Sequence, residues 1–136
     1  MSGDAATPRR PAPIVLLVED HESSADGYAQ LLTGAGYRVA RAKNGYEALA
    51  EVSRETPSLV ILDLKLPKLD GWDLLQRLKA DAASASVPVV VVTGDSLPSH
   101  HDMARSRGAV AVLSKPIDPA NLLAVVRDHV ATPSLH

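Results

Sequence analysis

Four charged residues stand at or next to the ends of apolar runs in this sequence, where side chains can do chemistry. They are Glu19 and Asp20 after residues 14–18, Asp63 after residues 59–62, and Lys115 two residues after the run 110–113. If those runs are parallel strands, their carboxyl ends lie along one edge of a sheet, and residues distant in the sequence can converge there. Three acids and a lysine brought together predict a site for a phosphoryl group and a metal ion.

The chemistry of such a site follows from the residue types. A carboxylate at the tip of a central strand, such as Asp63, can attack phosphorus and become an acyl phosphate. Clustered carboxylates repel by about 3 kcal/mol per pair at roughly 5 Å and an effective dielectric of about 20. A divalent cation such as Mg²⁺ and the ammonium group of Lys115 would relieve this repulsion. Thr93, which follows the run 89–92, can donate a hydroxyl hydrogen bond to the phosphoryl group.

The elements that must position these residues alternate between short apolar runs and amphipathic segments. Strands are predicted at residues 14–18, 37–41, 59–62, 87–92 and 109–113, and helices at 22–32, from 44 to before 57, at 70–80, at 98–107 and after Asp118. Asp118-Pro119 matches a helix cap followed by proline at the first helical position. Five βα units in series predict an α/β fold, a doubly wound parallel sheet of five strands with five helices on both faces.

Length and composition exclude several classes of protein. The 136 residues suit one domain, and the net charge of -2 argues against direct binding to nucleic acid. The absence of cysteine excludes disulfides, thiol nucleophiles and zinc-thiolate sites. No apolar stretch approaches the roughly 20 residues that span a bilayer, so we expect no membrane contact and a cytoplasmic location. We predict a disordered arm at residues 1–13, the folded domain at 14–131 and a tail at 132–136.

Five short motifs resemble, in the same order, the receiver domain of bacterial response regulators in two-component systems. They are Val18-Glu19-Asp20, Asp63 to Pro67, Asp70-Gly71, Thr93-Gly94 and Lys115-Pro116. Each motif is weak alone, but five in register from Ile14 to about Val130 are highly specific. The resemblance implies a flavodoxin-like sheet with strand order 2-1-3-4-5.

The resemblance also implies a phosphoacceptor, metal ligands, phosphoryl ligands and a cis-proline. The phosphoacceptor would be Asp63. The metal ligands would be Asp20 and Asp63 directly, Glu19 through water and Lys65 through its backbone carbonyl. Thr93 and Lys115 would bind the phosphoryl oxygens, and Pro116 would be the cis-proline. The implied metal is Mg²⁺ or Mn²⁺. The phosphoryl group would come from a phosphohistidine of a histidine kinase or histidine phosphotransfer protein that docks near the first helix. Output would pass through contacts with an unidentified downstream protein.

Two features depart from the usual pattern of the family. Most receivers carry Tyr or Phe three residues before the lysine, where this chain has Val112. We therefore predict that a signal leaves through the loop at 93–98 and the following helix. In addition, Lys65 and Asp95 are expected at the mouth of the site, where a pair between them would hinder water and lengthen the phosphoryl lifetime. Two solvated charges that contribute little remain the alternative.

Other functions compete with the first interpretation, which is a single-domain regulator. A receiver from a hybrid histidine kinase is the main alternative, and a phosphate-independent interaction module is a further one. A haloacid-dehalogenase-like phosphatase needs a second aspartate where this chain has Lys65. A flavodoxin-like cofactor binder needs a hydroxyl-rich loop after the first strand, where this chain has Glu19-Asp20.

Overall fold

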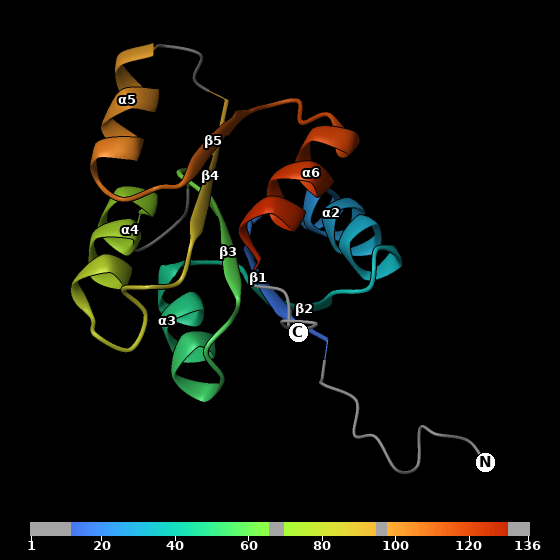
Figure 1. Ribbon diagram of the computed structural model, residues 1–136, viewed down its shortest axis with the longest axis horizontal. Helices are drawn as coiled ribbons and strands as arrows, with labels where there is room; N and C mark the ends of the chain where they lie inside the picture. The colour runs from blue at the N-terminus through green and yellow to red at the C-terminus, as the bar shows by residue number, and fades with distance from the viewer. Residues whose placement is uncertain (1–11, 66–69, 95–97, 131–136) are drawn as a thin grey trace, which may run out of the picture.

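Five parallel strands form one sheet with helices on both faces in the computed structural model, which describes residues 12–65, 70–94 and 98–130 (Figure 1). The strands are β1 (Ile14–Val18), β2 (Arg38–Ala42), β3 (Leu59–Asp63), β4 (Val89–Thr93) and β5 (Ala111–Ser114). The helices are α2 (Glu22–Gly34), α3 (Gly45–Arg54), α4 (Gly71–Ala80), α5 (Pro98–Ser106) and α6 (Pro119–His129). The strand order β2-β1-β3-β4-β5 confirms the flavodoxin-like topology that the resemblance implies.

The sheet separates two apolar cores because successive side chains of a strand point to opposite faces. Leu16 and Val18 of β1 pack with α3, α4 and α5, whereas Val15 and Leu17 pack with α2 and α6. Figure 1 shows the same division, with α3, α4 and α5 on one side of the sheet and α2 and α6 on the other. Every residue of β3 and β4 is buried. This burial on both faces explains why these two segments are nearly continuous apolar runs in the sequence.

The register of the strands brings the predicted site residues to one edge of the sheet. Asp63 pairs with Val92 of β4, and Thr93 pairs with Ser114 of β5. β3 and β4 each run one residue beyond the predicted end, so that Asp63 and Thr93 are the last residues of their strands. On the other side of β3, Val18 pairs with Leu62, which places the residue after β1 level with Asp63. The convergence predicted for the carboxyl ends of the strands is therefore confirmed.

Three strands begin one or two residues later than predicted. These are β2 at Arg38, β4 at Val89 and β5 at Ala111. The reason at β4 is a turn, in which the N–H of Val87 donates to the carbonyl of Ser84 at 2.9 Å, and Pro88 has no N–H to donate to a neighbouring strand. Before β5, Gly108 has a φ of 109°, and this left-handed residue ends α5. Both causes are local turns that the apolar pattern does not reveal.

The residues that precede β1 are held against the sheet by Arg38. Its backbone N–H donates to the carbonyl of Pro13 at 2.9 Å, and its Nε donates to the carbonyl of Ala12 at 2.8 Å. The last two residues of the predicted arm are therefore bonded to β2, while residues 1–11 and 131–136 lie outside the described residues. Among the residues that are described, no helix is long and apolar enough to cross a bilayer.

Candidate functional site

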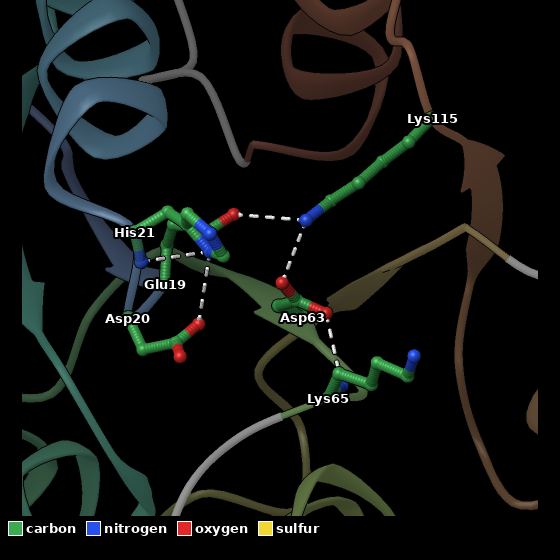
Figure 2. A network of polar contacts seen from close by, with 6 residues as sticks. All are labelled: Glu19, Asp20, His21, Asp63, Lys65 and Lys115. Carbon is green, nitrogen blue, oxygen red and sulfur yellow. Dashed lines mark hydrogen bonds and ion pairs between the residues drawn. The ribbon is translucent and has the colours of Figure 1, made fainter.

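Asp63 occupies the tip of β3, and both of its carboxylate oxygens accept hydrogen bonds. Oδ2 accepts from Nζ of Lys115 at 2.8 Å, and Oδ1 accepts from the backbone N–H of Lys65 at 2.9 Å (Figure 2). Only 6% of the Asp63 side chain is exposed. A carboxylate with these two donors is held in one orientation at the carboxyl edge of the sheet.

Lys115 joins two buried acids that lie far apart in the sequence. Its Nζ is 2.8 Å from Oδ2 of Asp63 and 3.2 Å from Oε1 of Glu19 (Figure 2). These pairs span 52 and 96 positions of the chain, respectively. Only 2% of the Glu19 side chain is exposed, whereas Lys115 keeps 29% exposure. One ammonium group thus offsets the repulsion between two carboxylates and remains accessible from the surface.

Burial and neighbouring charges govern the pKa values of Glu19 and Lys115. Burial raises the pKa of Glu19 above its ordinary value, and the negative charge of Asp63 acts in the same direction. The backbone N–H of His21 and the charge of Lys115 oppose this rise. Burial alone would lower the pKa of Lys115, but the hydrogen bond and charge of Asp63, together with Glu19, raise it above its ordinary value. Lys115 is therefore a firmly charged ammonium at neutral pH.

Glu19 also belongs to a group of possible metal ligands. Glu19, Asp20 and His21 offer ligand atoms that all lie within 4.8 Å of one another. Two carboxylates are the hard oxygen donors that Mg²⁺ prefers, so the residues present fit the divalent cation that the resemblance implies. Asp63, the other carboxylate ligand that the resemblance implies, is linked to this group through Lys115. A metal role for the Lys65 carbonyl stays a prediction.

His21 is the member of this group that the sequence analysis did not single out. Its backbone N–H donates to Oε2 of Glu19 at 3.2 Å, and Nδ1 of its ring lies 3.7 Å from Oδ1 of Asp20. The signal in the sequence was its place directly after the acid pair. Although His21 directly precedes α2, its side chain makes no cap hydrogen bond with that helix.

A cavity opens between the ends of β3 and β4. It measures about 310 Å³ and is lined by Asp63, Lys65, Thr93 and Gly94. Thr93 is buried, and its carbonyl accepts the backbone N–H of Lys115 at 2.8 Å. The cavity therefore lies beside the phosphoacceptor candidate and is bordered by the predicted phosphoryl ligand Thr93.

Gly71 supports the segment that follows Asp63, a role that the sequence analysis missed. Its N–H donates to the carbonyl of Leu64 at 3.1 Å. A Cβ at this position would lie 2.5 Å from Cα of Leu64 and 2.8 Å from the carbonyl oxygens of Asp63 and Leu64. The first residue of α4 therefore has to be glycine for the helix to lie this close to β3. The sequence signal was its place after Asp70, which caps α4 by accepting the N–H of Asp73 at 3.0 Å.

The remaining predicted residues have different outcomes. The Lys115–Pro116 peptide bond is cis, as the resemblance implies. Val112 is half-buried and packs on the core that contacts α3, α4 and α5. Asp95 and much of the predicted output loop lie outside the described residues, and Lys65 is exposed. The pairing of Lys65 with Asp95 and the route of the signal therefore stay predictions.

Comparison with known proteins agrees with this arrangement. Residues 15–127 match the family described as the response regulator receiver domain. The polar-differentiation response regulator DivK of Brucella anthropi is 29% identical over 116 residues, which cover 85% of this chain and 94% of DivK. Response regulator Rre1 of Synechocystis sp. is 36% identical over 118 residues, which cover 86% of this chain and 51% of Rre1.

A solved structure shows the same likeness in three dimensions. The receiver domain of the sensor histidine kinase PA1611 from Pseudomonas aeruginosa, which has a magnesium ion coordinated in its active site cleft, superimposes with a TM-score of 0.81. The two chains are 25% identical, and the match covers 89% of this chain and 99% of that one. From its sequence, its topology and the residues at the edge of its sheet, this chain belongs to the response regulator receiver domain family of two-component systems.

Proposed function

We propose that this chain accepts a phosphoryl group from phosphohistidine onto Asp63, with Mg²⁺ bound beside it, and then signals through contacts with another protein. Receiver domains of this family act as phosphorylation-dependent switches. The observation that carries the proposal is the bridge from Lys115 to Asp63 and Glu19 beside a cavity of about 310 Å³. A cation next to a fixed carboxylate is the arrangement that phosphoryl transfer requires, because positioning and charge stabilisation supply most of the catalysis.

The chain's own residues divide the work of the transfer. A carboxylate oxygen of Asp63 forms a bond to phosphorus while the bond from phosphorus to the imidazole nitrogen of the donor breaks, and the donor keeps that electron pair. Lys115 loses its charged partner when Asp63 becomes an acyl phosphate, and its ammonium then pairs with a phosphoryl oxygen. Thr93 borders the cavity and donates its hydroxyl to another phosphoryl oxygen. The backbone N–H of Lys65 holds Asp63 in place before the attack.

A divalent cation would be held by the carboxylates of Glu19 and Asp20 together with Asp63. When bound, Mg²⁺ supplies positive charge that offsets both the clustered carboxylates and the incoming phosphoryl group. The magnesium ion in the similar PA1611 receiver supports this assignment, and Mn²⁺ is the second option. Asp20 is open to the surface, with 35% of its side chain exposed, so the cation can enter from solvent.

The partners follow from the same chemistry. The donor is a histidine kinase or a histidine phosphotransfer protein in the cytoplasm, and it docks near α2, which begins just after the acid pair. Similarity to DivK along 94% of that protein supports action as a single-domain regulator. The second candidate, a receiver that is part of a hybrid histidine kinase, is favoured by the similarity to the PA1611 receiver. In both cases the switch takes up the phosphoryl group at Asp63 and catalyses only its own phosphorylation and dephosphorylation.

Intact-mass measurement after incubation with acetyl phosphate and Mg²⁺ tests this function. We expect the wild-type chain to gain one phosphoryl group and Asp63→Asn to gain none. Asp26→Asn is the matched control, because Asp26 pairs with Arg41 on the surface and is 63% exposed, so it should be labelled as the wild type is. No adduct in the wild type, or an undiminished adduct in Asp63→Asn, would overturn the proposal.

A further inference from the structure

The imidazole of His21 faces the carboxylate oxygens of the acid pair. Its Nδ1 lies 3.7 Å from Oδ1 of Asp20 and 4.0 Å from Oε2 of Glu19, and Figure 2 shows the ring beside these two side chains. Both separations are longer than a hydrogen bond. The ring therefore lies within ion-pair range of two carboxylates without a hydrogen bond to either of them.

These separations suit donors that share one cation. Nitrogen and oxygen donors lie about 2.1 Å from a small divalent ion, so two donors of one ion are at most about 4.2 Å apart. The ring of His21 meets this limit with Asp20 and with Glu19. Its side chain is 75% exposed, so the ring can adjust its rotamer without disturbing the core.

Other interactions hold the backbone of residue 21 in place. The N–H of His21 donates to Oε2 of Glu19, and its carbonyl accepts the N–H of Ala25 in the first turn of α2. The residue is thus fixed between the buried acid and the helix. Since its side chain makes no cap hydrogen bond with α2, the ring has no structural duty there that would compete with a metal.

The ring also changes the chemistry of the donor set. Carboxylates alone suit Mg²⁺ and Mn²⁺, whereas an imidazole nitrogen is a poor partner for Mg²⁺ and a good one for transition ions. We propose that His21 is a further metal ligand, which adds a nitrogen donor to Glu19 and Asp20 and shifts the preference of the site from Mg²⁺ toward divalent transition ions. This inference rests on the proposed function, because the same acids hold the metal there.

Mn²⁺ is the probe for the test, since it occupies oxygen sites and also accepts imidazole. Its binding can be followed by calorimetry, and pulsed electron paramagnetic resonance detects a directly bound nitrogen. In His21→Ala we expect the dissociation constant for Mn²⁺ to rise at least about tenfold, while that for Mg²⁺ changes by less than about threefold. The nitrogen coupling of bound Mn²⁺ should be present in the wild type and absent in His21→Ala. His101→Ala, which removes an imidazole on α5, should behave as the wild type does.

The outcomes separate this inference from the proposed function. Equal Mn²⁺ affinities in wild type and His21→Ala, or no nitrogen coupling in the wild type, would overturn the role of His21 and leave phosphorylation of Asp63 standing. If neither Mn²⁺ nor Mg²⁺ binds to the wild-type chain, the role of His21 and the metal site of the proposed function both fail. Mass labelling of Asp63 by acetyl phosphate then reports separately on the phosphoacceptor.

Discussion

Replacing Gly71 by alanine would force a methyl group against the backbone that carries Asp63. The new Cβ would lie 2.5 Å from Cα of Leu64 and 2.8 Å from two carbonyl oxygens. Favourable contacts between carbon atoms need about 3.5–4.0 Å, so the two segments must separate by roughly 1 Å. Backbone atoms cannot rotate away as the end of a flexible side chain can. We therefore expect Gly71→Ala to lower the free energy of unfolding by about 1–3 kcal/mol, the usual cost of overpacking.

Gly27→Ala is the matched control for this prediction. Gly27 lies inside α2, and a Cβ there would meet no heavy atom within 4 Å apart from its chain neighbours and the backbone of its own helix. Alanine at such an open helical position should raise the free energy of unfolding by about 0.5–1 kcal/mol. Replacing glycine by alanine should thus change the free energy of unfolding in opposite directions at these two helical positions. The difference comes from the Leu64 backbone, which lies close to Gly71.

Urea denaturation measures both effects. The midpoint should fall for Gly71→Ala and rise for Gly27→Ala, with an unchanged slope in each case. Labelling of Asp63 by acetyl phosphate should also slow in Gly71→Ala, because a shift of Leu64 displaces the Lys65 N–H that bonds Oδ1 of Asp63. A midpoint for Gly71→Ala at or above that of the wild type would refute the reasoning.

Three further predictions concern the charges of the site. Lys115→Ala leaves the buried carboxylates of Glu19 and Asp63 without their cation. It should therefore lower the free energy of unfolding by about 1–3 kcal/mol and slow the labelling of Asp63 by acetyl phosphate. A wild-type labelling rate would contradict the role of the bridge. Burial raises the pKa of the Glu19 carboxyl above 4.5, so the native state binds this proton more tightly than the unfolded state does. The stability that Glu19 contributes is therefore full below pH 4.5 and is lost as the pH rises through the raised pKa. Glu19→Gln should therefore lose less stability than the wild type from acid to neutral pH in urea titrations, and parallel curves would count against this. Lys65→Ala and Asp95→Ala should each lose the phosphoryl group faster than the wild type, and unchanged rates in both would remove the proposed pair.

Local features of the fold were predictable because their causes lie within a few residues. The continuous valines of β4 predicted a strand buried on both faces, and every residue of β4 is buried. Asp118 caps α6 by accepting the N–H of Ala120 at 3.2 Å, with Pro119 as the first helical residue. The starts of β2, β4 and β5 were wrong by one or two residues because hydrogen-bonded turns precede the strands, and the apolar pattern carries no signal for those bonds. The order of the strands came from the resemblance, since the alternation of strands and helices alone does not distinguish the possible orders.

By itself, the sequence determined which chemical groups stand at the ends of the strands, including the acids Glu19 and Asp63 and the cation Lys115. Only the tertiary structure decided which of these groups touch. Lys115 bonds both acids across 96 and 52 positions, His21 turns its ring toward the acid pair, and Gly71 lies against the segment that follows β3. The physical reason is that residue type and periodicity are local properties of a chain. Distances between side chains depend instead on strand order, register and the close packing of helices on the sheet.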